Sequence, residues 1–498
     1  MRMRVECNAK LARRWHLALV RRLKDVPDLA VSIKLIEGLP GSPPGLDALF
    51  QLEATIHGLA GYGQAERVAA ADLFALADAS DAPVDLVIDL CGNPMPGTER
   101  RWHLTYDGIA GEDGLIAAVL SGATPTVRLI EGEKIIAEGR LGTEYGGVAL
   151  ASFDEMLART VTLIAAAVAG SCRTRLPNVR QEAAGPPAAI PSISRLGQSA
   201  ARKVARRIVQ QIYRLCYNSP HWRVGWRKLD GPDLFDLGAH PKTGWTDLPD
   251  DGRRFYADPF PFVHQGKLTL FVEDFIHRLG KGIISAVDFI DGRPAGTPVP
   301  VLEHNCHLSY PFIFEEEGQI WMVPETSANG TIELFRATAY PGGWVKETDL
   351  VSGLTCSDAT LIRHDGAWWM FATVRDGGGA FSDALHLWSA PDFRGPWTAH
   401  KGNPVMIDIA TARPAGRMVV RNGHLLRPVQ DCRRGYGAAL AIARVTKLDH
   451  DGFEQEIEAM IGPGPGWPGR RLHSLNSAGG FEFIDGSATA PKWKALSH

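Results

Sequence analysis

Acidic residues recur at matching positions in the second half of this 498-residue chain. Asp258 and Asp358 each lie near the start of an apolar stretch, and Glu273 and Glu325 each end one. Carboxyl groups that converge on one pocket are what glycosyl chemistry needs, because one protonates the leaving oxygen while another acts as nucleophile or activates water. We therefore take Asp258, Glu325 and Asp358 as candidate catalytic residues.

These acidic residues belong to a repeated block. In the first three copies the block start, the glycine of an x-Gly turn and the block end fall at 258, 266 and 273, at 310, 318 and 325, and at 358, 366 and 373. A looser fourth copy starts near Arg413, turns at Asn422-Gly423 and ends at Gln430, and a degenerate fifth copy starts at His473 and reaches Asp485-Gly486. Hairpins that recur about every 50 residues are typical of a β-propeller.

The hairpins predict where the polar residues meet. An x-Gly turn between two apolar runs makes the start and end of each block cross-strand neighbours. The inner strands of a propeller all run in the same sense along its axis, so the block ends should collect at one mouth of the central channel. Besides the three catalytic candidates, we expect six substrate-binding residues there, namely Glu273, His307, Arg413, Gln430, Asp431 and His473.

Each of these residues has a structural alternative. An Asp at the start of an inner strand often only accepts backbone N–H groups and stabilises its blade. Asp274 competes with Glu273 for the axial position, and Asp431 has Arg427 and Arg433 as alternative partners. Arg413 can lower the pKa of a carboxyl group or bind a phosphate. No HExxH motif, dense His/Cys cluster or GxSxG elbow is present, so we predict no metal, no cofactor and no serine nucleophile, and leave open an axial calcium ion held by carbonyl groups and water.

Composition narrows the classes of protein. The net charge of −3 gives no general attraction to nucleic acid. The seven cysteines are scattered and lack CxxC spacing, which favours a reducing compartment over a disulfide framework. Charges interrupt the apolar runs of residues 1–23, and no window of 18 or more residues is uninterruptedly apolar. We therefore predict a cytoplasmic protein.

The chain divides into three parts. Residues 1–170 are predicted to form an α/β Rossmann-like domain with a doubly wound parallel sheet, from helices at 11–24, 47–56 and 153–169 and strands at 29–36 and 85–90. Residues 171–229 form a linker with a helix at 193–217, and residues 230–490 form the propeller. Between Glu182 and Asp230 the linker has nine Arg or Lys and no acidic residue. A basic amphipathic helix can lie on an anionic membrane, for instance the inner membrane face; the alternative is a helix docked on one domain.

The propeller motifs resemble a known family. The sequences FYADPFPFV, HLSYPFIFEEEGQIWMVPETS, SDATLIRHDGAWWMFAT, ARPAGR, LLRPVQDCRRGYG and HSLNSAGGFEFIDG, within about residues 221–487, are similar to the N-terminal domain of glucosamine inositolphosphorylceramide transferase and its bacterial relatives. That domain resembles the five-bladed propellers of the arabinanase, levansucrase and invertase superfamily. The resemblance implies that Asp258 is the base or nucleophile, that Asp358 tunes or stabilises, and that Glu325 is the general acid, although Glu325 ends a strand where the superfamily acid commonly begins one.

The N-terminal part is faintly similar to formyltransferases. DLVIDLCG resembles their central strand and RWHLTYDG a degraded form of the next segment, but the catalytic Asn–His–Asp arrangement and the HxSLLP motif are missing. The resemblance implies that this domain no longer transfers formyl groups.

Three functions follow as hypotheses. The first is a carbohydrate-active enzyme that cleaves or transfers a glycosyl group of a nucleotide-, lipid- or glycan-linked sugar. The second is a non-catalytic propeller that binds a glycan or glycolipid. The third is formyl or acyl transfer to an amino sugar by the N-terminal domain.

Overall fold

The computed structural model describes residues 1–59, 63–76, 82–92, 99–170, 176–179, 193–242 and 244–492. The chain forms two compact units: Met1–Ile208 with Asp376–Asp383 and Gly402–Ile409, and Val209–Arg375 with Ala384–Lys401 and Ala410–His498. The first unit thus includes two segments from within the range predicted for the propeller. Arg159, which is fully buried, pairs there with Asp376 and, at 2.9 Å, with Asp383. Much of the predicted linker, residues 171–175 and 180–192, lies outside the described residues.

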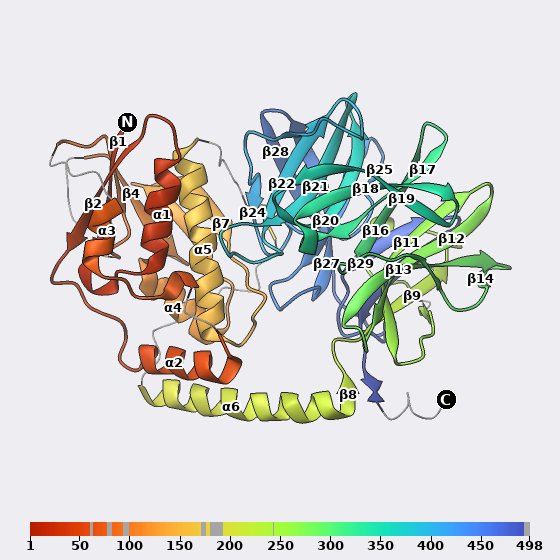
Figure 1. Cartoon of the computed structure of the whole chain (residues 1–498), viewed down its shortest axis with the longest axis horizontal. Helices are drawn as coiled ribbons and strands as arrows, with labels where there is room; N and C mark the ends of the chain where they lie inside the picture. The colour runs from red at the N-terminus through yellow and green to blue at the C-terminus, as the bar shows by residue number, and fades with distance from the viewer. Residues whose placement is uncertain are drawn as a thin grey trace. The chain divides into compact units, whose positions relative to one another are not determined.

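The first unit is built on a mixed sheet (Figure 1). The strand order is β2 (Ala30–Ile36), β1 (Arg2–Asn8), β3 (Leu86–Asp89), β4 (Arg101–Tyr106), β6 (Thr126–Glu131) and β7 (Lys134–Arg140), and β5 (Ile109–Ala110) pairs with β4. The helices are α1 (Arg14–Lys24), α2 (Leu46–His57), α3 (Ala70–Leu76), α4 (Glu112–Ser121) and α5 (Ala149–Val168). Met3 and Val5 of β1 pack into one core with Trp15 of α1 and Phe153 of α5.

An α/β class is confirmed for this unit, but the prediction of a parallel sheet is wrong for one side of it. β1 pairs in parallel with β2 and β3, and β3 with β4. β6 and β7 are antiparallel to their neighbours. Glu131 pairs with Lys134, so the two strands are joined by a two-residue turn. So short a connection can join only antiparallel strands.

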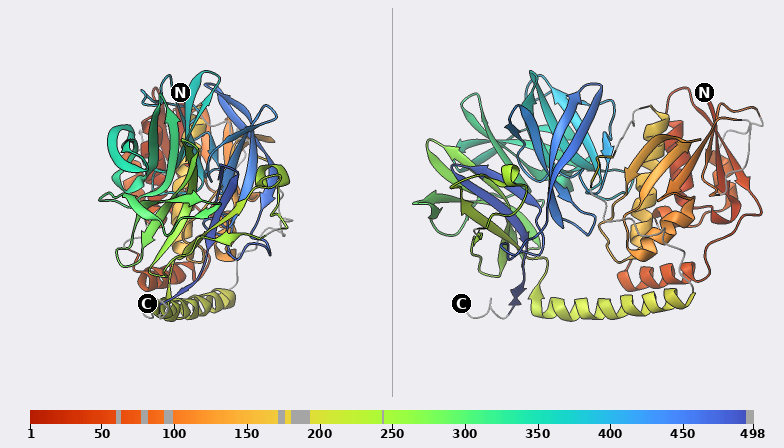
Figure 2. Two further views of the ribbon diagram at one scale, coloured as in Figure 1. Left: turned by 90° about the vertical axis from the view of Figure 1, so that its right-hand side faces the viewer. Right: turned by 180° about the vertical axis from the view of Figure 1, so that it is seen from behind.

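The second unit contains five sheets, each built on a path of four paired strands and arranged as propeller blades (Figure 2). Blade 1 is β11 (Arg254–His264), β12 (Lys267–Ile276), β13 (Lys281–Ile290) and β14 (Arg293–Pro294), with β15 (Val299–Leu302) on β13. Blade 2 is β16 (Ser309–Glu316), β17 (Gln319–Thr326), β18 (Thr331–Ala339) and β19 (Gly342–Ser352). Blade 3 is β20 (Thr355–His364), β21 (Ala367–Arg375), β22 (Ala384–Ala390) and β23 (Thr398–Ala399), and blade 4 is β25 (Val419–Arg421), β26 (His424–Asp431), β27 (Ala439–Asp449) and β28 (Gly452–Ile461). The predicted five-bladed propeller is therefore confirmed.

Blade 5 joins two distant segments of the chain. It consists of β10 (Thr246–Asp247), β9 (Trp222–Lys228), β30 (Phe481–Ser487) and β29 (Ser474–Ala478). β9 and β30 lie side by side and antiparallel, with Phe483 opposite Trp226. Residues 222–228, which the sequence analysis assigned to the linker, therefore belong to the propeller. The linker composition hid this strand because its arginines and lysine suggested a continuation of the basic segment.

The basic segment of the linker forms helix α6 (Ile193–Cys216). Near its C-terminal end, Val209, Ile212 and Leu215 are 63%, 56% and 76% exposed. Spacings of three residues place these side chains along one side of the helix. Within the described residues, no helix has the length and hydropathy required to cross a membrane.

Candidate active site

Three blades carry the same backbone irregularity at the start of the repeated block. Asp258, Tyr310 and Asp358 have left-handed φ values of 48°, 45° and 56°. In each strand the pairing register shifts at this point, which marks a β-bulge. A left-handed residue other than glycine costs about 1–2 kcal/mol, so the fold must stabilise it elsewhere.

The bulge turns the backbone N–H group toward a carboxylate of the preceding blade. Asp258 N–H donates to Asp485 Oδ2 at 2.8 Å, Tyr310 N–H donates to Asp258 Oδ2 at 3.1 Å, and Asp358 N–H donates to Glu325 Oε2 at 3.2 Å. The carboxylates of blades 5, 1 and 2 are thus each bound to the next blade around the ring. The structural role that was the alternative for Asp258 is present, and it coexists with the convergence of carboxyl groups from several blades.

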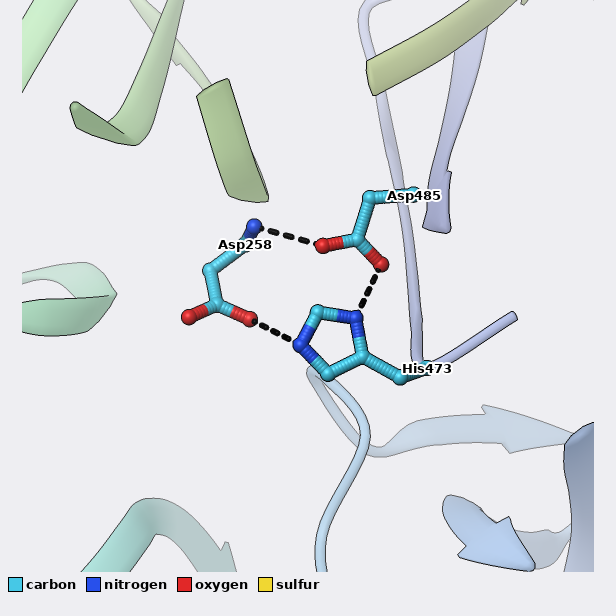
Figure 3. A group of neighbouring side chains, drawn as sticks. All are labelled: Asp258, His473 and Asp485. Carbon is cyan, nitrogen blue, oxygen red and sulfur yellow. Dashed lines mark hydrogen bonds and ion pairs between the residues drawn. The ribbon is translucent and has the colours of Figure 1, made fainter. Parts of the chain in front are cut away.

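Asp258, His473 and Asp485 point toward one another (Figure 3). His473 Nδ1 lies 2.5 Å from Asp485 Oδ1, and its Nε2 lies 3.3 Å from Asp258 Oδ1. Burial alone would lower the pKa of His473, but Asp485 and Asp258 raise it above its ordinary value. Burial raises the pKa of Asp258 to about 7, against the effect of His473. One oxygen or nitrogen from each residue lies within 4.8 Å of the others, so this group is also the candidate for holding a cation among the described residues.

Asp358 lies in a second cluster with Arg413. Arg413 Nε donates to Asp358 Oδ2 at 2.6 Å, and Gln430 Nε2 donates to the same oxygen at 3.0 Å. Arg413 also lies 3.8 Å from Glu325, and its guanidinium carbon is 4.7 Å from the centre of the Tyr436 ring. Burial raises the pKa of Asp358 to about 7, although Arg413 acts in the opposite direction.

Two further predicted residues meet at the first blade. Glu273 is buried and pairs in the strand register with Ala257, the residue that precedes Asp258. His307 Nε2 lies 3.4 Å from Glu273 Oε1. Asp274, the predicted competitor, instead pairs with Arg254 at 2.8 Å and accepts a hydrogen bond from Ser285. Glu273 is therefore the residue of this pair that joins the axial carboxyl groups.

Within the part of the chain that the structure describes, Asp431 pairs with Arg433 rather than with the axial residues around Gln430. Its carboxylate accepts hydrogen bonds from the backbone N–H, Nε and Nη2 of Arg433. Successive side chains of a strand point to opposite faces, so Gln430 and Asp431 of β26 cannot both contact Asp358. The partner that the sequence analysis kept as the alternative, Arg433, is the one the structure shows.

Asp485 and Tyr436 are the site residues that the sequence analysis did not identify. Asp485-Gly486 was predicted only as the point that a degenerate fifth block reaches; Ala478 pairs with Phe481, so the turn of this blade is Gly479-Gly480. Asp485 instead pairs with Ser474 at the end of the hairpin, the position that Glu273 and Glu325 occupy in their own blades. The Gly-Gly pair was the available signal. Tyr436 follows a strand in a loop without a repeat pattern, so although it lies within the motif LLRPVQDCRRGYG, its position gave no reason to place it at the axis.

The first unit also contains a His–Asp pair. His103 Nδ1 lies 3.2 Å from Asp89 Oδ2, and Arg101 lies 3.7 Å from the same oxygen. Asp89 Oδ1 accepts the Cys91 N–H at 2.8 Å. The residues that follow, 93–98, lie outside the described part of the chain, so the similarity to formyltransferases stays a prediction.

The fold and the axial cluster define a class: a five-bladed β-propeller that gathers carboxyl groups from several blades around buried Arg and His side chains. A family model described as glucosamine inositolphosphorylceramide transferase 1, N-terminal, matches residues 247–479. Among the axial residues described above, this range omits Asp485. The resemblance predicted from the motifs is therefore confirmed for the propeller.

Curated relatives carry the same description. Glucosamine inositolphosphorylceramide transferase 1 of Oryza sativa subsp. japonica is 32% identical over 246 residues, which cover 47% of this chain and 33% of the relative. The Arabidopsis thaliana protein of the same name is 30% identical over 246 residues, with 47% and 32% covered. The matched region thus spans about a third of the length of these relatives.

Solved structures of glycoside hydrolases are similar at low sequence identity. A thermostable family-43 glycoside hydrolase is 15% identical with a TM-score of 0.32, covering 43% of this chain and 78% of that one. A family 117 glycoside hydrolase of Zobellia galactanivorans is 14% identical with a TM-score of 0.33, covering 54% of this chain and 91% of that one.

Proposed function

We propose that the propeller is a carbohydrate-active enzyme that cleaves or transfers the glycosyl group of a sugar conjugate. The observation that supports it most is the division of the axial carboxyl groups into two environments. Asp258 lies between the Tyr310 N–H and His473, whereas Asp358 and Glu325 share Arg413. Carboxyl groups in unlike environments can divide the tasks of acid, base and charge stabilisation.

The environments suggest roles. Asp258, with a pKa of about 7, can take a proton from an attacking water or acceptor hydroxyl near neutral pH. Asp358, fixed by Arg413 and Gln430, and Glu325 supply negative charge that stabilises positive charge developing at the anomeric carbon. The names of the relatives combine glucosamine with inositolphosphorylceramide, which makes amino sugars and sugar–lipid conjugates the first substrates to test.

An activity screen on glycosides and nucleotide sugars tests the proposal. Wild type is compared with Asp258→Asn and Glu325→Gln, and with Glu347→Gln as a control on the half-exposed outer strand β19. Both axial variants should lose activity by at least about a hundredfold while staying folded, as expected for loss of a general acid, base or charge-stabilising group. Unchanged turnover in both would refute the assignment.

A non-catalytic propeller that binds a glycan or glycolipid is the second candidate. It is favoured by the backbone N–H groups that Asp258 and Glu325 accept, because such bonds suit carboxylates that stabilise blades. Saturable binding of a sugar without turnover, unchanged in Asp258→Asn, would favour this candidate. Acyl transfer by the first unit, supported by the Asp89–His103 contact, would instead survive both axial substitutions.

We also propose that α6 binds an anionic membrane surface. The exposed Val209, Ile212 and Leu215 provide an apolar stripe, and the surrounding sequence is basic without acidic residues. This combination suits a helix that lies in the membrane interface. A peripheral position at the cytoplasmic face would bring a sugar–lipid substrate close to the propeller; the cytoplasmic location itself is part of the proposal.

A further inference from the structure

The Glu273 carboxyl group has an unusual set of neighbours. It is buried at the axial end of β12, and within the described part of the chain its one polar contact is His307 Nε2, 3.4 Å from Oε1. Glu325, the corresponding residue of blade 2, accepts the Asp358 N–H, accepts a hydrogen bond from Ser327 Oγ at 2.8 Å and lies 3.8 Å from Arg413. The two glutamates at equivalent positions therefore have different chemistry.

His307 lies beside one oxygen of Glu273. Gly282 N–H donates to His307 Nδ1 at 2.8 Å, so Nδ1 is the acceptor and the ring proton lies on Nε2, which faces Glu273 Oε1. Burial lowers the pKa of His307, and Lys281 acts in the same direction, so the ring stays neutral. A neutral imidazole orients the carboxyl group without holding it as a carboxylate.

The contact requires a glycine beside it. A Cβ atom on Gly282 would lie 2.7 Å from His307 Cε1 and 2.9 Å from Glu273 Oε1. Both distances are shorter than carbon contacts allow, so the backbone of β13 makes room for the His307–Glu273 pair. The pair is thus part of the construction of the site.

The charged groups around Glu273 favour its protonated form. It faces Asp258 from β11, Glu325 from β17, Asp485 from β30 and its own neighbour Asp274. The nearby cations are engaged elsewhere, Arg413 with Asp358 and His473 with Asp258 and Asp485. Burial raises the pKa of Glu273 well above its ordinary value, and these carboxylates raise it further.

We infer that Glu273, rather than Glu325, donates the proton to the leaving glycosidic oxygen. The inference rests on the proposed function. As the bond between the anomeric carbon and the glycosidic oxygen breaks, its electron pair stays on that oxygen, which takes the proton from Oε2 and leaves as an alcohol. The oxygen of water or of an acceptor hydroxyl bonds to the anomeric carbon and releases its proton to Asp258. Asp258 then releases that proton to solvent and Glu273 takes one from solvent, which restores both groups.

Leaving groups of different basicity test this role. The full-length wild type, Glu273→Gln and Glu325→Gln are assayed on methyl and 2,4-dinitrophenyl glycosides of the sugars hydrolysed or transferred in the screen. A dinitrophenolate leaves without protonation, whereas an alkoxide does not. Glu273→Gln should lose at least about a hundredfold on the methyl glycoside and less than about tenfold on the dinitrophenyl glycoside. Glu325→Gln should lose a similar factor on both.

Four results would overturn the inference, the last of them together with the proposed function. Equal losses by Glu273→Gln on both glycosides would mean that it positions rather than protonates, and a selective loss on methyl glycosides by Glu325→Gln would make that residue the acid. Unchanged turnover of Glu273→Gln would remove it from the chemistry while leaving the proposed function standing. A wild type inactive on every glycoside would sink the proposed function and this role together. Circular dichroism and melting temperature establish that the variants are folded.

The pH profile gives a second readout. Loss of a group that must be protonated removes the alkaline limb of a bell-shaped profile, while loss of a base removes the acidic limb. Wild type should therefore decline at alkaline pH on methyl glycosides but not on dinitrophenyl glycosides, on which Glu273→Gln should stay active over the same pH range. A wild-type alkaline limb retained in Glu273→Gln would contradict the role.

Discussion

Asp258 both links neighbouring blades of the fold and belongs to the proposed catalytic residues. Its left-handed backbone directs its N–H to Asp485, and its carboxyl group binds the next blade through the Tyr310 N–H. Neither contact supplies a full positive charge, and the His473 contact at 3.3 Å is shared with Asp485. The same burial that raises the pKa of Asp258 to about 7 makes its ionised form costly to the folded state.

Stability should therefore depend on pH through this residue. The pKa of Asp258 is raised in the folded chain from an ordinary 3.8 to about 7, so the folded state binds a proton that the unfolded state has lost. The stabilisation of the folded state that comes from the raised pKa of Asp258 is fully present below about pH 4 and is lost as the pH rises to about 7. Asp258→Asn, which cannot ionise, should gain on the order of several kcal/mol relative to wild type between pH 4 and pH 8. Urea unfolding at both pH values measures this, and a pH-independent difference would contradict it.

At the scale of the element, the β-bulges shape the proposed active site and α6 forms the proposed membrane-binding surface. The bulges at 258, 310 and 358 turn backbone donors toward carboxylates without changing the strand pairing farther out. The proposed role of α6 instead rests on its exposed apolar side chains, because Val209, Ile212 and Leu215 remain exposed in the described chain. An exposed apolar stripe within a basic helix indicates a partner with both apolar and anionic groups.

Replacing the apolar stripe should abolish membrane binding. We expect wild type to co-sediment with vesicles of phosphatidylserine and phosphatidylcholine, and a Val209→Ser, Ile212→Ser, Leu215→Ser variant to remain in the supernatant. Removing three exposed apolar side chains from a helix should leave folding intact. The matched control is Val345→Ser with Val420→Ser, exposed valines of the propeller strands β19 and β25. Equal sedimentation of both variants, or no preference of wild type for anionic vesicles, would refute a role of α6 in lipid binding.

At the scale of the whole molecule, closure of the propeller depends on blade 5. β9 and β30 come from opposite ends of the unit and pair along their full lengths. A buried ion pair joins them: Arg227 Nη2 lies 2.6 Å from Glu482 Oε2, and Glu482 Oε1 accepts the Leu234 N–H at 2.7 Å. Removing one member leaves the other charge buried and uncompensated.

Glu482→Ala should accordingly destabilise the propeller by about 3–5 kcal/mol. The matched control is Glu458→Ala, which breaks an Arg444–Glu458 pair of 2.9 Å whose glutamate is 42% exposed and should cost less than about 1 kcal/mol. Urea unfolding followed by tryptophan fluorescence compares the two. Similar small effects would mean that strand pairing alone closes the ring.

Local patterns in the sequence were enough to predict the propeller and most of its axial residues. The x-Gly turns have fixed spacing, and a hairpin converts that spacing into cross-strand contact, so Asp258, Glu325, Asp358 and Arg413 could be grouped without coordinates. The parallel sheet was predicted wrongly because the prediction followed the alternation of helices and strands and did not take the short turn between β6 and β7 into account. Asp431 was predicted to bind substrate, and because the structure shows its carboxylate paired with Arg433, that role stays a prediction.

The order of residue types alone shows which blocks repeat, and therefore which residues lie at the end of each blade. Only the tertiary structure decided what each carboxyl group contacts there, because the bulges change the direction of a backbone N–H without leaving a mark in residue spacing. It also decided that Glu273 faces a neutral imidazole while Glu325 lies beside a guanidinium. Charge at such positions depends on burial and on groups from other blades, which are far apart in the chain and meet only when the ring closes.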